Sequence, residues 1–293
     1  MTKIIPDSEL ILNPDGSIYH LNLHPADIAN DIITVGDPDR VDNVASRLDE
    51  IYLTKHKREF KTITGRVGSK DVTILSTGIG TDNIDIVFTE LDALVNIDLD
   101  SRQKKADHVK INFYRLGTSG ALRADVPVGS TLISQYAIGL ESLMHFYDYD
   151  ERTVTAKNLT NKARAAIAKM LPNIYPYTTA ASTRLTNVYG GLGKLGVTVT
   201  ATGFYGPQGR SVLAKPKHTT FLDELAKIEE HESAVTNLEM ETAGIYGMAH
   251  VLGHEAISFN AIIANRISQK FSSDPKQVVD NMIDEFFNVF TEA

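Results

Sequence analysis

Short apolar runs alternate along this chain with longer segments in which apolar residues return at helical spacing. The short runs predict buried strands at residues 31–36, 60–67, 72–76, 111–116, 131–136, 197–204 and 255–264. Helical spacing predicts helices at 84–94, 156–170, 218–231 and 241–252, and another from Pro38. Because strands and helices alternate without a repeat or a low-complexity linker, we expect one continuous α/β domain over residues 1–293.

The final helix has the clearest pattern. Ser273 or Asp274 can cap it, and Pro275 suits its first turn. Its apolar stripe consists of Val279, Met282, Ile283, Phe286 and Phe290. We expect this stripe to pack into the core rather than to bind a ligand.

Two segments fall outside the alternation. Residues 1–17 predict an N-terminal extension, and the charged stretch 96–110 predicts a surface insertion because it has no clear apolar face. The N-terminus lacks the apolar stretch of a signal peptide, and no window approaches the roughly 20 apolar residues of a membrane span. We therefore expect no membrane partner.

Composition narrows the classes of function. The chain has 29 basic and 37 acidic residues and a formal net charge of −8. Binding a nucleic acid by charge requires many phosphates to be neutralised at once, so we expect no nucleic-acid partner, whereas one small anion remains compatible. The absence of cysteine excludes disulfides, thiolate metal sites and a cysteine nucleophile, and favours a cytoplasmic location.

Two loops join glycine to arginine directly after predicted strands. They read Gly36-Asp-Pro-Asp-Arg40 and Arg115-Leu-Gly-Thr-Ser-Gly120. Exposed backbone N–H groups and a guanidinium together suit a phosphate-like dianion. Tight turns alone would explain either loop, but the two together favour an anion site.

A third glycine loop, Gly78-Ile-Gly80, follows another predicted strand. A dinucleotide-binding loop needs a further glycine where this chain has Asn83. We therefore exclude a nicotinamide-dependent dehydrogenase.

Two further segments carry paired polar side chains. Glu239 and Glu241 lie where a short apolar run meets a helix, and a carboxylate there can accept hydrogen bonds from adjacent sugar hydroxyls. Favourable charge at a helix N-terminus is the alternative for one of them. Gln208 and Arg210 together match a pyrimidine edge and Phe204 offers a stacking face, although an exposed polar loop would look the same.

These motifs resemble those of the nucleoside phosphorylase superfamily, most of all its uridine phosphorylase branch. The resemblance runs from about Tyr19 to the final helix. It rests on five motifs in order: Gly36-Asp-Pro-Asp-Arg40-Val, Ser76-Thr-Gly-Ile-Gly80, Arg115-Leu-Gly-Thr-Ser-Gly120-Ala, Phe204-Tyr-Gly-Pro-Gln208-Gly-Arg210 and Asn237-Leu-Glu-Met-Glu-Thr-Ala243.

The resemblance implies a fold and a reaction. The fold is a single-domain three-layer α/β/α sandwich with a central mixed β-sheet. The reaction is a pentosyl transfer, the reversible phosphorolysis of uridine to uracil and ribose 1-phosphate by direct attack of phosphate on the anomeric carbon. No cofactor is implied, because inorganic phosphate is a co-substrate.

The resemblance also implies site residues. The implied phosphate ligands are Gly36, Arg40, Arg58, Arg115 and Thr118. The implied ribose contacts are His20, Met240 and Glu241, and the implied base contacts are Phe204, Gln208, Arg210 and Arg266. Arg115, Gln208, Arg210 and Glu241 are the implied catalytic groups.

Assembly is implied in the same way. His20 and Arg58 resemble residues that a neighbouring subunit supplies, so a homodimer is the minimal unit and a hexamer stays open. Glu59 and Ile79 match the ligands of a monovalent cation between subunits, but Asn83 replaces the expected serine, which leaves a metal undecided.

Alternative functions are open. A purine nucleoside phosphorylase usually has an aspartate where this chain reads Asn265-Arg266, and the reversed order Gly206-Pro207 leaves room for a broader pyrimidine specificity. A hydrolytic nucleosidase has no use for three arginines. A nucleoside-binding protein without turnover is the non-enzymatic alternative.

Overall fold

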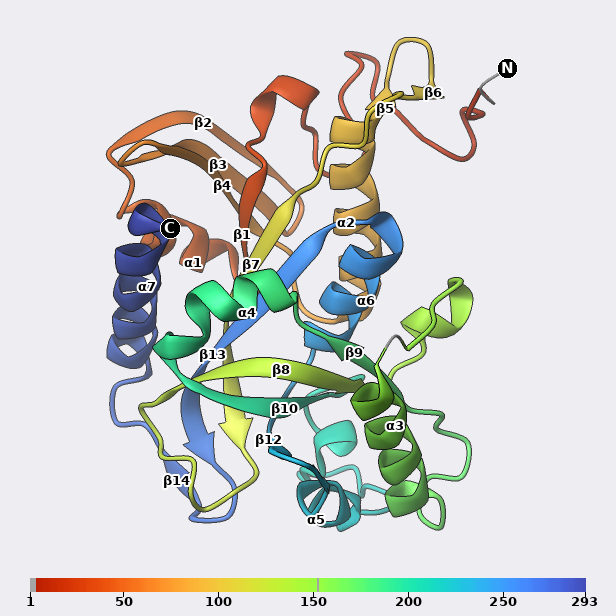
Figure 1. The fold of residues 1–293 in the computed structure, drawn as a ribbon, viewed down its shortest axis with the longest axis vertical. Coiled ribbons are helices and arrows are strands. Elements are labelled where there is room, and N and C mark those ends of the chain that lie inside the picture. The colour runs from red at the N-terminus through yellow and green to blue at the C-terminus, as the bar shows by residue number, and fades with distance from the viewer. Residues whose placement is uncertain (1–3, 152) are drawn as a thin grey trace.

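A mixed twelve-stranded sheet forms the centre of the computed structural model, which describes residues 4–151 and 153–293 (Figure 1). Its strands are β1 (Asp31–Val35), β2 (Glu50–Lys57), β3 (Phe60–Val67), β4 (Lys70–Ser76), β7 (Asn112–Ala121), β8 (Thr131–Gly139), β9 (Tyr177–Ala180), β10 (Lys194–Thr200), β11 (Glu229–Glu230), β12 (Ser233–Glu239), β13 (Glu255–Asn265) and β14 (Lys270–Phe271). The strand order is β11-β12-β10-β8-β13-β7-β1-β4-β3-β2, with β9 on β8 and β14 on β13.

Helices cover both faces of this sheet. They are α1 (Pro38–Ala45), α2 (Thr81–Asn96), α3 (Val154–Ile167), α4 (Thr183–Tyr189), α5 (Phe221–Ala226), α6 (Thr242–Leu252) and α7 (Pro275–Glu292). Within residues 4–151 and 153–293, none of them combines the length and the hydropathy needed to cross a bilayer.

Alternating side chains of the central strands divide the core into two layers. Ile32 of β1 and Phe113 of β7 pack with α2 and α6, whereas their neighbours Ile33 and Tyr114 pack with α1, α4 and α7. Strand residues alternate between the faces of a sheet, so both faces of these strands are buried under helices. This arrangement confirms the single α/β domain with a central mixed sheet (Figure 1).

Five strands of the sheet close into a ring. β12 pairs with β10 on one side, and Asn237 and Leu238 of β12 also pair with Ala121 and Gly120 at the end of β7. β7 therefore belongs both to the ring β12-β10-β8-β13-β7 and to the open half of the sheet that continues through β1. The ring brings the end of β12 beside β7.

The final helix follows its sequence pattern. The Asp274 carboxylate accepts a hydrogen bond from the backbone N–H of Gln277 at 3.0 Å, so Asp274 rather than Ser273 is the cap. All five residues of the predicted stripe are buried. The stripe is core packing, as its spacing predicts.

Several predicted elements are wrong in their extent. The strand predicted at 111–116 continues to Ala121, so Arg115-Leu-Gly-Thr-Ser-Gly120 is part of β7 and is not the predicted loop. The strand predicted at 197–204 ends at Thr200, because Gly203 and the Gly206–Gln208 turn follow. The helix predicted at 218–231 is only α5, because the chain then folds into β11 and β12 around His231, which has a left-handed φ of 54°. The sequence patterns also missed β2, β9, β12 and α4.

The stretch 96–110 forms a small hairpin that projects from the domain near the N-terminus (Figure 1). Its strands are β5 (Ile97–Asp98) and β6 (Gln103–Lys104). Arg102 donates hydrogen bonds to the carbonyls of Ile5 at 2.9 Å and Pro6 at 3.2 Å. The N-terminal extension and the hairpin are therefore joined by these hydrogen bonds. The interpretation of the hairpin as an insertion stays a prediction.

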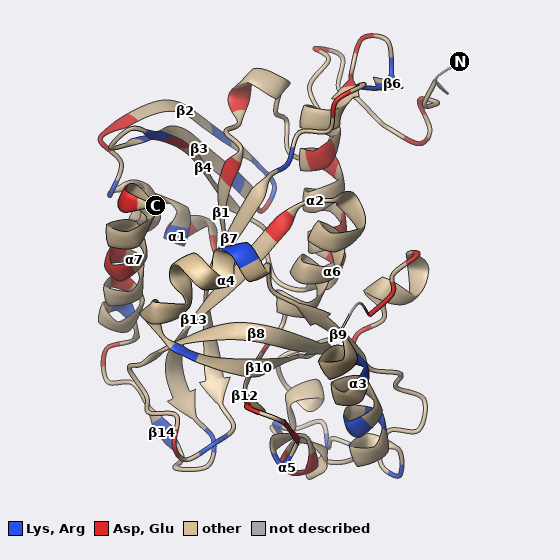
Figure 2. Ribbon diagram, viewed as in Figure 1, with Lys and Arg blue, Asp and Glu red and all other residues tan. Residues whose placement is uncertain are grey.

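Charged residues are scattered over the ribbon rather than gathered on one face (Figure 2). The central strands β8 and β10 are almost free of charge, and both basic and acidic residues occur around the periphery. The one buried arginine among the described residues is Arg115. Its surroundings are therefore the first place to look for chemistry.

Candidate active site

Arg115 lies in β7, and its guanidinium lies along the strand over Gly117. Only 7% of the residue is exposed. A β-carbon at Gly117 would lie 2.0 Å from Nη1 of Arg115, so the fold of this side chain requires glycine there. The sequence spacing Arg115-Leu-Gly117 thus encodes the position of the guanidinium.

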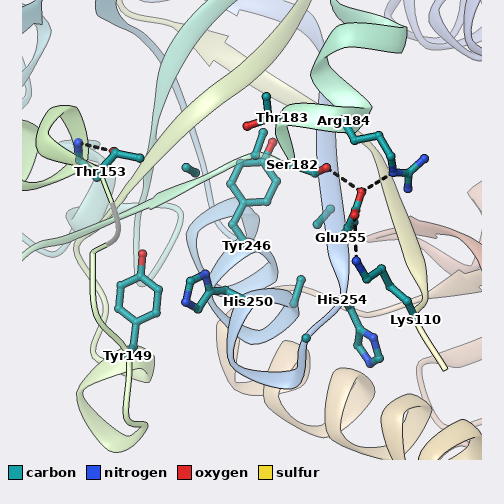
Figure 3. Close-up of a pocket in the computed structure, with 16 residues that line it drawn as sticks. Lys110, Tyr149, Thr153, Ser182, Thr183, Arg184, Tyr246, His250, His254 and Glu255 are labelled. Atoms are coloured by element: carbon teal, nitrogen blue, oxygen red, sulfur yellow. Dashed lines mark hydrogen bonds and ion pairs between the residues drawn. The ribbon is translucent and has the colours of Figure 1, made fainter. Parts of the chain in front are cut away.

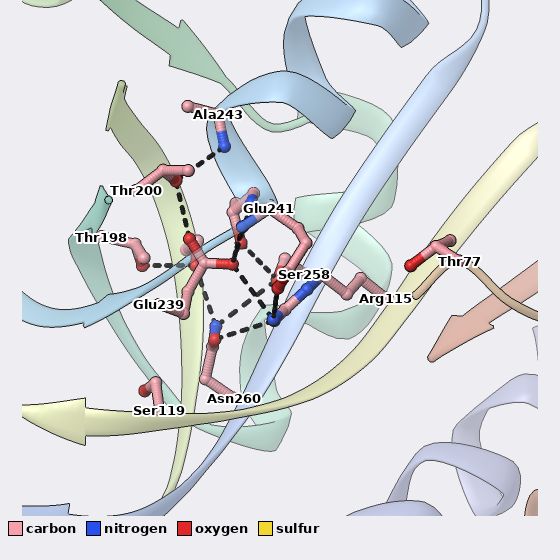
Figure 4. A network of polar contacts seen from close by, with 12 residues as sticks. Thr77, Arg115, Ser119, Thr198, Thr200, Glu239, Glu241, Ala243, Ser258 and Asn260 are labelled. Atoms are coloured by element: carbon pink, nitrogen blue, oxygen red, sulfur yellow. Dashed lines mark hydrogen bonds and ion pairs between the residues drawn. The ribbon is translucent and has the colours of Figure 1, made fainter. Parts of the chain in front are cut away.

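The guanidinium binds two carboxylates from the end of β12 (Figure 4). Nη2 lies 3.0 Å from Glu239 Oε2 and 2.7 Å from Glu241 Oε2, while Nη1 donates to Asn260 Oδ1 at 3.1 Å. We call Arg115, Glu239 and Glu241 the carboxylate corner. Burial disfavours the charged guanidinium, but the two carboxylates outweigh that effect and raise the pKa of Arg115.

Glu239 accepts hydrogen bonds from three protein donors besides its contact with Arg115. Thr200 Oγ1 donates to one oxygen at 2.6 Å, and the backbone N–H groups of Glu241 and Thr242 donate to the other at 2.8 Å each. The carboxylate therefore fixes the first turn of α6 and orients Arg115 at the same time. The motif analysis named Glu239 but did not place it among the site residues, although its spacing from Glu241 is the signal that could have done so.

Glu241 keeps acceptor capacity for a ligand. The backbone N–H of Gly80 donates to Oε1 at 2.9 Å, and Arg115 donates to Oε2. Burial raises the pKa of Glu241, with Glu239 adding to the effect and Arg115 opposing it. Each carboxylate oxygen can accept two hydrogen bonds, so capacity remains for adjacent hydroxyls, and half-buried Met240 lies between the two carboxylates in sequence.

Arg40 approaches the corner from another strand end. Gly36 follows β1, and Asp37 caps α1 by accepting the Asp39 N–H at 3.0 Å, which sets Arg40 in the first turn. Burial lowers the pKa of Arg40, and the nearby Arg115 adds to this effect. Over the described part of the chain, the Arg40 guanidinium has no hydrogen-bond or ion-pair partner.

The charges of this region cancel. Arg40 and Arg115 contribute two positive charges, and Glu239 and Glu241 contribute two negative ones. A dianion at Arg40 would therefore need a further cation or donors nearby. Thr118, half-buried on β7 opposite Ala261, is one candidate donor, because no described residue hydrogen-bonds its hydroxyl.

The predicted base contacts lie together on one loop. Residues 204–210, here called the 204–210 loop, hold Phe204, Gln208 and Arg210, and Arg266 donates a hydrogen bond to the Gln208 carbonyl. Gln208 is only 4% exposed. Phe204 lies on the loop beyond the end of β10 and is half exposed, so the expectation that a strand end presents it is wrong.

Within this loop the predicted readers bind one another. The Arg210 guanidinium lies 3.8 Å from the centre of the Phe204 ring, and its Nη1 donates to Gln208 Oε1 at 2.5 Å and to the Phe204 carbonyl at 2.6 Å. Burial and the neighbouring Arg266 lower the pKa of Arg210. A bound ring would have to replace these contacts with contacts of its own.

His20 and Arg58 lie apart from the carboxylate corner. His20 binds Glu90, nine residues into α2, or about 14 Å along the helix from the turn at Gly80 that binds Glu241. Arg58 is exposed in the β2–β3 turn with a left-handed φ of 57°, and no described residue forms a hydrogen bond or ion pair with its side chain. Neither completes the corner of its own chain.

Two clusters of side chains have ligand-type atoms close enough together to be considered as cation sites. A β-carbon at Gly78 would lie 2.5 Å from Asn83 Nδ2 and 3.1 Å from Glu59 Cγ, so these two side chains meet at the glycine loop whose Ile79 is exposed. Their amide and carboxylate oxygens are of the type that binds hard cations.

The second cluster brings ligand atoms of Asp92, His108 and His254 within 4.8 Å of one another. The Ile111 N–H donates to His254 Nδ1 at 3.2 Å, so the proton of the neutral ring is on Nε2, which lies 3.2 Å from Asp92 Oδ1. A metal at Nε2 would displace that proton and leave no N–H on the ring. This cluster therefore fits a metal poorly.

A cavity of about 430 Å³ lies beside the start of β13, and His254 is among the residues that line it (Figure 3). Lys110 and Arg184 both point at the Glu255 carboxylate, at 3.2 and 2.7 Å, and Ser182 donates to it at 2.8 Å. The charged side chains that line this cavity therefore pair largely with one another. None of the residues predicted for the site lines it.

Comparison with known proteins agrees with the fold. A sequence profile of the Phosphorylase superfamily matches residues 31–293. A crystal structure of a Trypanosoma brucei nucleoside phosphorylase, described as showing uridine phosphorylase activity, matches with a TM-score of 0.86 at 28% identity, covering 97% of this chain and all of that one.

Curated relatives differ in the substrate that their names carry. A Thermococcus kodakarensis protein named uridine phosphorylase is 28% identical over 257 residues, which span 88% of this chain and 80% of that protein. A Halorubrum lacusprofundi protein named guanosine phosphorylase is 33% identical over 129 residues, which span 44% of this chain and 45% of that protein.

Proposed function

We propose, from the premise that this chain belongs to the phosphorylase superfamily and is a nucleoside phosphorylase, that its substrate is uridine. Inorganic phosphate would attack the anomeric carbon of the ribose while the bond to the uracil nitrogen breaks. The electron pair of that bond leaves with uracil, and the products are uracil and ribose 1-phosphate. Phosphate is a co-substrate, and the proposal needs no other cofactor.

Arg40 is proposed to bind the phosphate. It is half-buried next to Arg115 and Glu241 and has no partner among the residues that the structure describes. The Gly36 backbone and the Thr118 hydroxyl add directed donors. Because the charges of Arg40 and the carboxylate corner cancel, Arg58 from a second copy of the chain is proposed to supply the missing positive charge.

Glu241 is proposed to hold the ribose against that phosphate. Its remaining acceptor sites suit the sugar hydroxyls, and its bond to Arg115 links sugar and phosphate recognition in one geometry. As the glycosidic bond breaks, the ribose gains positive charge, which the buried carboxylate stabilises. Holding both reactants in place supplies a large part of the acceleration.

The 204–210 loop is proposed to bind uracil. Gln208 can donate and accept, Arg210 only donates, and both can direct donors at the carbonyl oxygens of a leaving uracil anion. Phe204 offers a face for stacking once Arg210 moves to the base. Arg266 donates a hydrogen bond to the Gln208 carbonyl and so helps to hold the loop in place.

The observation that carries the phosphorolysis is Arg40, which has no partner among the described residues and lies beside the Arg115–Glu241 pair. Incubation with uridine should release uracil only when phosphate is present. A panel with inosine, thymidine and 2′-deoxyuridine in parallel defines the base and the sugar. Release of hypoxanthine from inosine without uracil from uridine would replace the proposal by a purine nucleoside phosphorylase.

Arg40→Ala tests the phosphate role directly. We expect the KM for phosphate to rise at least about tenfold, because a charge-assisted contact is lost. Arg47→Ala is the matched control, since Arg47 lies just beyond the end of α1 and binds Asp284 at 2.9 Å on the surface. Equal behaviour of the two variants would contradict the assignment.

A further inference from the structure

Glu90 is a buried carboxylate in the middle of α2 that binds two neighbouring residues of the N-terminal segment. It accepts hydrogen bonds from the backbone N–H groups of His20, at 2.9 Å, and of Leu21, also at 2.9 Å. Its Oε1 lies 2.6 Å from His20 Nδ1. The side chain of Glu90 is 10% exposed, whereas that of His20 is 28% exposed.

This arrangement fixes which nitrogen of His20 carries the proton. An ionised carboxylate only accepts hydrogen bonds, so the short contact requires an N–H at Nδ1. In the neutral ring the lone pair is then on Nε2, at the far end of the imidazole. No described residue hydrogen-bonds Nε2, which is therefore available as an acceptor for a hydroxyl group.

The carboxylate also fixes the position of the ring. Two backbone bonds hold the chain at His20 and Leu21, and the side-chain bond holds the imidazole, all on one rigid helical residue. His20 lies about 14 Å along α2 from the Gly80 end of that helix, so it cannot reach the Glu241 of its own chain. The Nε2 atom of His20 is therefore not placed to contact a ligand held by the Glu241 of the same chain.

We propose that Glu90 is a positioning residue, which holds His20 with Nε2 outward to accept a hydrogen bond from the 5′-hydroxyl of a nucleoside bound by a second copy of this chain. The inference rests on the proposed function, since it takes uridine as the substrate. It adds a residue outside every predicted motif of the site. A carboxylate that orients a histidine through Nδ1 is a recurrent device in enzymes.

The test compares uridine with 5′-deoxyuridine, which lacks only the hydroxyl in question. Glu90→Gln preserves size but presents an amide N–H toward Nδ1, so the ring proton is driven to Nε2. We expect kcat/KM for uridine to fall about tenfold and kcat/KM for 5′-deoxyuridine to change less than about twofold. His20→Ala should give the same pattern, and the double variant should lose no more than His20→Ala alone.

Controls separate this role from a structural one. Asp98→Asn removes an exposed carboxylate just beyond α2, which accepts the Ser101 N–H at 2.7 Å, and should leave both substrates unaffected. If Glu90→Gln does not unfold cooperatively near the wild-type temperature, Glu90→Asp is used instead, because it keeps the charge but withdraws it from Nδ1. It should also lose activity on uridine selectively.

Two results would overturn the inference in different ways. Equal losses on uridine and 5′-deoxyuridine in the Glu90 variant, or a full additional loss in the double variant, would reduce Glu90 to a structural residue while the proposed function stands. Failure of the wild-type protein to release uracil from either nucleoside would refute the proposed function and this inference together.

Discussion

The carboxylate corner and the 204–210 loop hold their polar side chains by opposite means. In the corner, Arg115 is buried within β7, Glu239 and Glu241 are buried where β12 ends, and their partners come from five separate segments of the chain. In the loop, Phe204 is half exposed and Arg210 takes its partners from residues at most six positions away. One region is built by the whole fold and the other largely by itself.

This difference has a consequence for function. Groups held by a rigid scaffold keep their geometry when ligands change, as bond-making chemistry requires. Groups held by local contacts can exchange those contacts for a ligand at modest cost, as recognition of one base among several requires. The same division would let the base preference vary without disturbing phosphate and ribose, and the following four predictions test it.

Removal of Arg115 should have the largest effect. Arg115→Ala leaves two buried carboxylates without their cation, so we expect about 3–5 kcal/mol less stability and at least about a thousandfold loss in kcat/KM. Chemical unfolding and uracil release measure the two losses. Arg123→Ala, which breaks surface ion pairs with Asp125 and Glu229, should cost about 0–1 kcal/mol. Similar costs for the two variants would remove the distinction between corner and loop.

The next largest expected effect is a pH dependence of the folding stability, caused by Glu141. Burial raises the pKa of Glu141 from 4.5 to about 7. The folded protein then binds this proton more tightly than the unfolded chain, so the stabilisation is complete below pH 4.5 and is lost as pH rises through 7. The loss amounts to about 3 kcal/mol at about 1.4 kcal/mol per pH unit.

Glu141→Gln mimics the protonated side chain and should flatten the stability profile between about pH 4.5 and 7. Urea unfolding at fixed protein concentration measures this, because subunit association also affects stability. Asp125→Asn is the control: hydrogen bonds from Lys194 and Arg123 lower the pKa of Asp125 to about 2, outside the window. A profile of Glu141→Gln as steep as that of the wild type would show that another group titrates there.

A smaller and more selective effect is expected in the loop. Arg210→Ala should reduce kcat/KM for uridine about 10- to 100-fold, because donors to the base are lost, while the KM for phosphate and the melting temperature stay nearly unchanged. Arg164→Ala removes a comparable guanidinium, 5.0 Å from the Tyr175 ring, and should leave activity intact. A large loss of stability in Arg210→Ala would mean that the loop, too, is part of the scaffold.

The smallest effect lies outside both regions. Asp274→Ala removes the cap of α7 and should cost about 1 kcal/mol without a change in kcat or KM. Chemical unfolding and steady-state kinetics on the same preparation measure it. This variant calibrates how much stability the protein can lose while both regions keep working, and a drop in kcat would show that the corner depends on packing at a distance.

Local signals in the sequence predicted local structure well. Asp274, Pro275 and the apolar stripe of α7 are within a few turns of each other, and so are Gly36 and Arg40. The five motifs likewise predicted that Arg115 and Glu241 share a site, as do Gln208 and Arg210, and each pair is hydrogen-bonded. Short-range geometry determines the helix, the turn and the loop, so short-range patterns reveal them.

Long-range contacts outside the five motifs were beyond those patterns. β12 and the ring closure depend on pairing between residues near 120 and 238, which leaves no period in either segment. The bond between Glu90 and His20 spans 70 positions, and the stacking of Arg210 on Phe204 depends on a loop conformation rather than on spacing. The end of β10 at Thr200 was misplaced because the apolar run continues past the last paired residue.

Closure of the five-stranded ring also affects the order in which strand pairs form during folding. β7 can pair early with β1, but β12 reaches β7 only after more than a hundred further residues have folded between them. Contacts across such separations form slowly, because loop entropy is lost before they are made. The nascent chain therefore carries Arg115 well before it carries Glu239 and Glu241, and Arg115 meets these two carboxylates only in the step that closes the ring.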